Sequence, residues 1–99
     1  MIFCNRKLTC NDLEDFLNNN HMFPKVLHSD KAQIERQKTI TNFIKGSIRV
    51  LIATDVAARG LDLPNVHLIV NFDMPDNLDD YLHRIGRTGR AGQTGTAIT

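Results

Sequence analysis

Apolar residues along this chain occur in two patterns, short unbroken runs and spacings of three and four residues. Short unbroken runs indicate buried strands, whereas spacings of three and four residues indicate amphipathic helices. Runs and helical spacings alternate along the whole sequence, and the segments between them are short. This alternation predicts an α/β fold, with a parallel sheet and helices on both of its faces.

The same patterns locate the individual elements. The predicted strands cover residues 2–4, 25–28, 49–54, 66–72 and 96–99. The predicted helices cover roughly residues 10–19, 30–45, 55–59 and 76–85. The apolar positions expected to face the core from two of these helices are Ile40, Phe43 and Ile44, and Leu78, Tyr81, Leu82 and Ile85.

Polar residues and a glycine mark the expected helix ends. Thr9, Asp30 and Asp76 are expected near helix starts, because their side-chain oxygens can accept backbone N–H groups there. Gly46 is expected to end the second long helix, since glycine adopts the left-handed conformation that closes many helices.

Composition narrows the possible functions. A formal net charge of +1 over 99 residues argues against a general polyanion binder, so any anion site must be local. No run of eighteen apolar residues is present, so we expect no membrane span. Cys4 and Cys10 form no CxxC pair and are expected to be reduced thiols of an intracellular protein, nuclear or cytoplasmic. The four histidines lack metal-ligand spacing, so no metal site is expected.

Both ends of the chain lie within apolar stretches, at 2–4 and at 96–99. Whole domains usually carry polar residues at their ends. We therefore expect residues 1–99 to form part of one domain of a longer protein.

Parallel α/β sheets bind ligands at the carboxyl ends of their strands, which here directs attention to ATDVAARGLD, residues 53–62. Thr54 and the backbone N–H groups after it can meet a phosphate. Gly60 allows the backbone to turn, and Asp62 offers a carboxylate to hydroxyls such as those of a ribose. A capped turn in an ordinary α/β unit explains the same residues equally well.

A second candidate site lies at the start of the helix after residue 30. Gln33 and Arg36 are three residues apart and share one side of its first turn. A helix N-terminus, an amide and a guanidinium together favour a phosphate backbone. Asn5 follows the first strand and can also contact an anion. The alternatives are a solvated helix face and a simple loop start.

The third candidate is HRIGRTGRAG, residues 83–92, in which Arg84, Arg87 and Arg90 are spaced three apart. Guanidinium groups bind phosphate oxygens through paired donors, and the interleaved glycines allow close backbone approach. The alternatives are a solvated basic loop or an arginine–glycine tether for RNA. His83 fits either a functional or a structural role.

These segments resemble motifs of DEAD-box ATP-dependent RNA helicases. MIFCNRK resembles motif IV, QIER resembles motif IVa, ATDVAARGLD resembles motif V and HRIGRTGR resembles motif VI. The resemblance covers essentially the whole chain, in order. It implies the second of the two RecA-like domains of such a helicase, in incomplete form.

The resemblance also implies partners and cofactors. ATP would lie in the cleft between the two RecA-like domains, and RNA would cross both. The Walker A loop and the DEAD carboxylates, which hold most of the Mg²⁺ contacts, belong to the first domain and are absent from this sequence. The implied protein is a monomer that binds RNA independently of sequence, and this chain alone would be inactive.

Residue roles follow from the same resemblance. Arg87 and Arg90 resemble the arginines that reach the γ-phosphate, with Arg90 as the arginine finger. Gly60 and Asp62 resemble the ribose site, and His83 resembles an interdomain contact. The residues that resemble RNA sugar–phosphate contacts are Asn5, Gln33, Arg36 and Thr54. Arg59 and Arg84 are expected to be structural or closure residues.

Two departures and two alternatives qualify this expectation. Ser29 and Arg6 stand where the family usually has glycine and threonine or serine, so affinity for RNA or its path can differ. A truncated, non-enzymatic module that binds RNA or protein is the main alternative function. A DNA-directed helicase of the same superfamily is the second alternative, and it is disfavoured by His83 and by the ARGLD pattern at 58–62.

Overall fold

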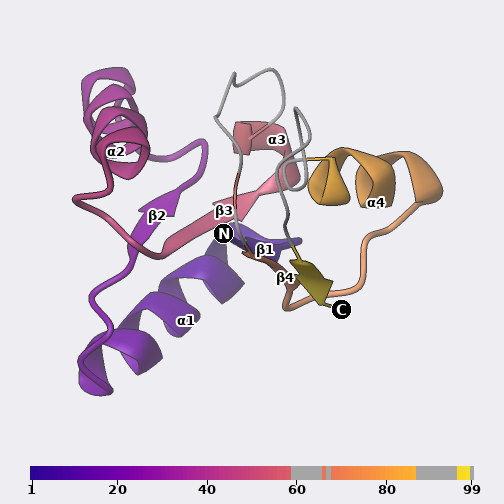
Figure 1. Cartoon of the computed structure of the whole chain (residues 1–99), viewed down its shortest axis with the longest axis horizontal. Helices are drawn as coiled ribbons and strands as arrows, with labels where there is room; N and C mark the ends of the chain where they lie inside the picture. Colours follow the sequence, from indigo (N-terminus) through magenta and orange to yellow (C-terminus); the bar gives the residue numbers. More distant parts are fainter. Residues whose placement is uncertain (59–65, 67, 87–95, 99) are drawn as a thin grey trace.

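The computed structural model describes residues 1–58, 66, 68–86 and 96–98, with the side chains of 96–98 left out. Its centre is a five-stranded parallel sheet with the strand order β2-β3-β1-β4-β5 (Figure 1). The strands are β1 (Ile2–Cys4), β2 (Lys25–Leu27), β3 (Leu51–Thr54), β4 (Leu68–Asn71) and β5 (Thr96–Ile98). Each expected strand is present. β1 has the expected bounds, whereas β2, β3 and β4 are shorter than expected at one or both ends.

Four helices connect or flank these strands in the described part of the chain. They are α1 (Lys7–Asn19), α2 (Gln33–Lys45), α3 (Asp55–Ala58) and α4 (Leu78–Ile85). None of the described helices is long and apolar enough to cross a membrane.

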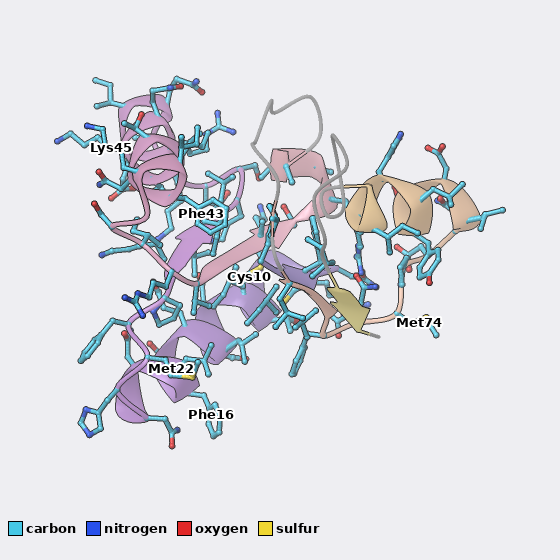
Figure 2. The ribbon with its side chains drawn as sticks, viewed as in Figure 1. Cys10, Phe16, Met22, Phe43, Lys45 and Met74 are labelled. Atoms are coloured by element: carbon cyan, nitrogen blue, oxygen red, sulfur yellow. The ribbon has the colours of Figure 1, made fainter. Side chains whose placement is uncertain are left out.

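The two faces of the sheet bury different residues, because successive strand residues point to opposite faces. On one face, Cys4, Val26 and Ile52 pack against Cys10 and Leu17 of α1. Figure 2 shows Cys10 of α1 and Phe43 of α2 approaching the sheet from opposite sides. The sheet is therefore covered from both faces, as the sequence predicts.

The second face carries the larger core. Phe3, Leu51 and Ile69 of the sheet pack there with Ala57 of α3 and with Phe43 of α2. On this face, α4 closes over the end of β1, where the guanidinium of Arg84 lies 5.2 Å from the centre of the Phe3 ring.

Cys4 and Cys10 are fully buried and free of a disulfide, as expected. A hydrogen bond to Cys10, together with burial, raises the pKa of the Cys4 thiol. These thiols belong to the packing between β1 and α1.

The helix starts differ from the sequence-based expectation at three places. Arg6, not Thr9, is the N-cap of α1, and Ala32, not Asp30, is that of α2; neither cap makes a side-chain hydrogen bond. Asp30 instead accepts a hydrogen bond from Lys7 Nζ at 3.0 Å. At α4, the Oδ1 atom of Asn77, and not of Asp76, accepts from a backbone N–H of the first turn.

Other expectations about helix ends and faces have mixed outcomes. Gly46 ends α2 in the left-handed conformation, with φ of 84°, as expected. Ile44, Leu78 and Leu82 were expected to be buried but are about half exposed or more, so this expectation is wrong. Helical spacing alone overestimated how much of α2 and α4 the sheet can cover.

Candidate functional site

Arg84 lies at the centre of the carboxyl edge of the sheet, and its side chain is 0% exposed. Its Nε and Nη2 atoms donate to the two carboxylate oxygens of Asp55 at 2.7 and 2.6 Å. Nη1 donates to Asn71 Oδ1 at 3.3 Å and to the Asp73 carbonyl at 2.8 Å. Nη2 also donates to Asn5 Oδ1 at 2.5 Å. A guanidinium has five N–H donors, so every one of them is used.

The partners of Arg84 come from separate elements. Asn5 follows β1, Asp55 opens α3 directly after β3, and Asn71 ends β4. Burying a charge costs free energy unless the group is paired and fully hydrogen-bonded, and here both conditions are met. Arg84 thus fastens α4 to the ends of three strands and has the structural position expected of it.

Thr54 occupies the last position of β3 and is buried. Its Oγ1 atom accepts from the Ala57 backbone N–H at 3.4 Å, so the side chain caps α3. This geometry matches the capped turn considered as an alternative. A hydroxyl that accepts one bond still has a proton to donate, so the cap does not prevent a second contact.

A cavity of about 800 Å³ opens at the same edge. Its lining includes Asn5, Thr54 and Asp55. The remaining lining residues are Val56, Asp76, Asn77, Leu78, Asp79 and Asp80. The structure therefore brings together two of the expected RNA residues, Asn5 and Thr54.

Gln33 and Arg36 lie apart from this cavity, on the first turn of α2. An Nη2–H of Arg36 donates to Gln33 Oε1 at 2.5 Å, so the two side chains share one side of the helix as expected. Among the described residues, Arg36 Nε is buried without a hydrogen-bond partner. The pair therefore presents a guanidinium close to the positive end of a helix dipole.

His28 is a buried histidine to which the sequence patterns assigned no role, and it does not line the cavity. It is buried at the end of β2, where Nδ1 accepts from the Asp30 backbone N–H at 3.2 Å and Nε2 bonds Asn11 Oδ1 at 3.1 Å. These partners fit a neutral ring with its proton on Nε2. Burial, followed by the charge of Lys31, lowers the pKa of His28.

His83 lies in the last turn of α4 with an exposed side chain, and its Nδ1 is 3.7 Å from Asp79 Oδ2. Asp79, Asp80 and His83 hold possible metal-ligand atoms within 4.8 Å of one another. Clusters of exposed acidic side chains often hold no metal, so this cluster does not indicate a metal site. Five other expected residues lie outside the described part of the chain, namely Arg59, Gly60, Asp62, Arg87 and Arg90.

Comparison with protein families gives a direct match. The model of the helicase conserved C-terminal domain matches residues 1–92. The ATP-dependent RNA helicase DBP2 of Candida glabrata is 46% identical over all 99 residues, which are 18% of that protein's length. DEAD-box ATP-dependent RNA helicase 40 of Oryza sativa subsp. japonica is also 46% identical, and the chain spans 12% of it.

Solved structures agree with this match. The yeast DEAD-box splicing factor Prp28 has a TM-score of 0.92 and 46% identity, over 98% of this chain and 22% of that one. E. coli SrmB, solved with the regulator of ribonuclease activity A, has a TM-score of 0.90 and 43% identity, over 98% of this chain and 57% of that one. S. cerevisiae Dbp5 bound to RNA and ADP BeF3 has a TM-score of 0.88 and 42% identity, and the match covers 98% of this chain and 26% of Dbp5.

The parallel sheet with helices on both faces is thus the RecA-like fold of these helicases. All four motif-like segments lie within the residues that the family model matches. On these grounds the chain belongs to the helicase conserved C-terminal domain family, in the form carried by DEAD-box ATP-dependent RNA helicases.

Proposed function

We propose that this chain is the C-terminal domain of an ATP-dependent RNA helicase, in which it completes an ATP site held mainly by the first RecA-like domain. The observation that supports this most is the set of hydrogen bonds made by Arg84. They fix α4, whose C-terminus leads directly to Arg87 and Arg90, against the residues that follow β3. A rigid base of this kind suits arginines that must meet a ligand bound by another domain.

In this proposal, Arg87 and Arg90 reach the γ-phosphate of ATP, and Arg90 stabilises the charge that develops in the transition state. Asp62 holds the ribose, with Gly60 beside it. Mg²⁺ is held mainly by the first domain. His83, exposed on the last turn of α4, contacts the first domain when the two close.

RNA is proposed to lie along the carboxyl edge of the sheet. Gln33 and Arg36 bind its sugar–phosphate backbone from the start of α2, and Thr54 does so from the cavity edge, where Asn5 also lies. Contacts of this kind do not read sequence. The structure of the relative Dbp5 with RNA and ADP BeF3 supports the proposal that this domain takes part in binding both RNA and a nucleotide. The partners are therefore RNA and the first domain, in an intracellular monomer.

Replacing Arg90 with alanine in the full-length protein tests the nucleotide role. An arginine finger contributes about 10³–10⁵ in rate in phosphoryl-transfer enzymes, so RNA-stimulated ATP hydrolysis should fall by at least about 10³-fold. Binding of RNA should change little. Arg49→Ala is the matched control, because Arg49 is an exposed arginine that precedes β3, away from the carboxyl edge of the sheet. Unchanged hydrolysis in Arg90→Ala would contradict the role.

A non-enzymatic module that binds RNA or protein is the second candidate. It is favoured by one observation, that these 99 residues contain neither GxxxxGK[ST] nor DEAD. Finding both motifs in the same polypeptide decides for the enzyme. Comparing the stimulation of ATP hydrolysis by RNA and by DNA separates an RNA helicase from a DNA-directed relative.

A further inference from the structure

Asn5 uses its polar groups within the domain. Its backbone N–H donates to Asp73 Oδ2 at 2.9 Å, and its side-chain Nδ2 donates to the Met74 carbonyl at 2.8 Å. Nδ2 also lies 3.5 Å from Asp76 Oδ1. The remaining side-chain atom, Oδ1, accepts from Arg84. An amide has two N–H donors and one carbonyl oxygen, and each is engaged.

These bonds join segments that are distant in sequence. One end of the amide contacts residues 73–76, the connection between β4 and α4, and the other end contacts Arg84 inside α4. In Figure 2, Met74 lies on this connection, below α4. Asn5 therefore links β1 to both the entrance and the C-terminal half of α4.

A phosphate oxygen of RNA can only accept hydrogen bonds, so a phosphate bound at Asn5 would have to displace one of the bonds that Nδ2 donates. Loss of the Nδ2 bond would release the Met74 carbonyl, and loss of the Oδ1 bond would leave a donor of the buried Arg84 unpaired. An unsatisfied buried donor of a charged group is costly. Direct recognition of a phosphate by this side chain is thus opposed by its own surroundings.

We propose that Asn5 is a positioning residue, which holds the 73–76 connection and Arg84 in place and so sets the orientation of α4, without touching RNA. Loss of the Asn5 side chain would then change the orientation of α4. Because α4 is followed in sequence by Arg87 and Arg90, the rate of ATP hydrolysis would fall. This kinetic consequence rests on the proposed function, whereas the structural consequence does not.

Asn5→Ala and Asn5→Asp in the full-length protein test the proposal, with Arg6→Ala as the control for amide exchange. Arg6 is the exposed neighbour of Asn5 at the start of α1. Asn5→Asp keeps an acceptor for Arg84, so the buried guanidinium stays paired, but it loses the donor to the Met74 carbonyl. It therefore tests the bond to Met74 separately from the bond to Arg84. Three quantities are measured, namely the Kd for single-stranded RNA, kcat at saturating RNA, and backbone amide exchange.

Both variants should bind RNA within about twofold of the wild type and lose about tenfold or more in kcat, as small misplacements of catalytic groups do. Amide exchange should quicken at 73–76 and within α4, but not in α2. Arg6→Ala should leave exchange at 73–76 unchanged.

Two results would overturn the proposal. One is a tenfold weaker RNA affinity with unchanged exchange at 73–76, which would make Asn5 a direct ligand. The other is faster exchange over the whole domain in both variants, which would make its role generally structural. If the wild type lacks RNA-stimulated hydrolysis, the proposed function fails, and exchange at 73–76 alone still decides the role of Asn5.

Discussion

At the residue scale, the structure gives Arg84, the first of three regularly spaced arginines, a place inside the domain. Arg84, Arg87 and Arg90 share one spacing and one glycine-rich setting in the sequence. Spacing alone does not separate them, whereas the family resemblance assigned Arg84 to the structure of the domain. The observed burial of Arg84 supplies the physical reason, since all five of its N–H groups have partners inside the domain.

Replacing Arg84 tests the contribution of this buried group. Arg84→Ala leaves the carboxylate of Asp55 without its partner, so the free energy of unfolding should fall by about 3–5 kcal/mol. The free energy of unfolding of Arg84→Lys should lie between those of the wild type and Arg84→Ala, because an ammonium group has only three donors and no planar fork. Urea unfolding measures both changes.

The exposed Arg49 provides the control for this pair of variants. Arg49→Ala should change the free energy of unfolding by no more than about 0.5 kcal/mol, as is usual for surface positions. A loss in Arg84→Ala as small as that of Arg49→Ala would show that the ion pair with Asp55 does not hold the domain together.

At the element scale, the patterns predicted the existence of helices better than their ends. The sequence offers two adjacent candidates for the cap of α4, Asp76 and Asn77. A cap bonds the N–H group three residues later, and the path of the chain after β4 determines which residue stands there. In the structure, Asn77 Oδ1 accepts from the Asp80 N–H at 2.8 Å, and Asp76 lies at the edge of the cavity.

Asn77→Ala and Asp76→Ala form a matched pair that tests this assignment. Loss of the cap in Asn77→Ala should lower the free energy of unfolding by about 1 kcal/mol. Asp76→Ala should lower it clearly less, because within the described residues the exposed Asp76 carboxylate has a single side-chain contact, at 3.5 Å from Asn5 Nδ2. Thermal or urea unfolding provides the comparison, and an equal or larger loss in Asp76→Ala would contradict the assignment.

At the scale of the whole molecule, a net charge of +1 predicts that RNA affinity depends on a few local contacts. Each contact with a phosphate of single-stranded RNA contributes about 0.7 to the slope of log K against log salt concentration. Arg36 is proposed to make such a contact from the start of α2. Arg36→Ala should therefore reduce the magnitude of that slope by about 0.7, measured by RNA titrations at several salt concentrations.

Lys45 is the control for the salt experiment, since it lies in the last turn of the same helix (Figure 2). Lys45→Ala removes the same charge at the other end of α2 and should leave the slope unchanged. If the two variants reduce the slope equally, RNA binding reflects the total charge of the domain and is not local to the start of α2.

The sequence by itself determined the order of strands and helices, the parallel α/β class, the near-neutral charge and the order of the motif-like segments. These features depend on local periodicity and residue type, which are read directly along the chain. They were enough to identify the family that the comparisons show. Helix caps and half-exposed helix faces were predicted less well, because they depend on where neighbouring elements lie.

Only the tertiary structure decided which polar residues meet at the carboxyl edge of the sheet. Asn5 and Arg84 are 79 residues apart in sequence, and Asp55 and Arg84 are 29 apart, yet both pairs are hydrogen-bonded. No local pattern encodes such contacts, since they arise when parallel strands bring their carboxyl ends together. Packing thus buries Arg84 and makes Asn77 the cap of α4. It also places the side-chain amide of Asn5 in hydrogen bonds with Met74 and Arg84 of the same domain.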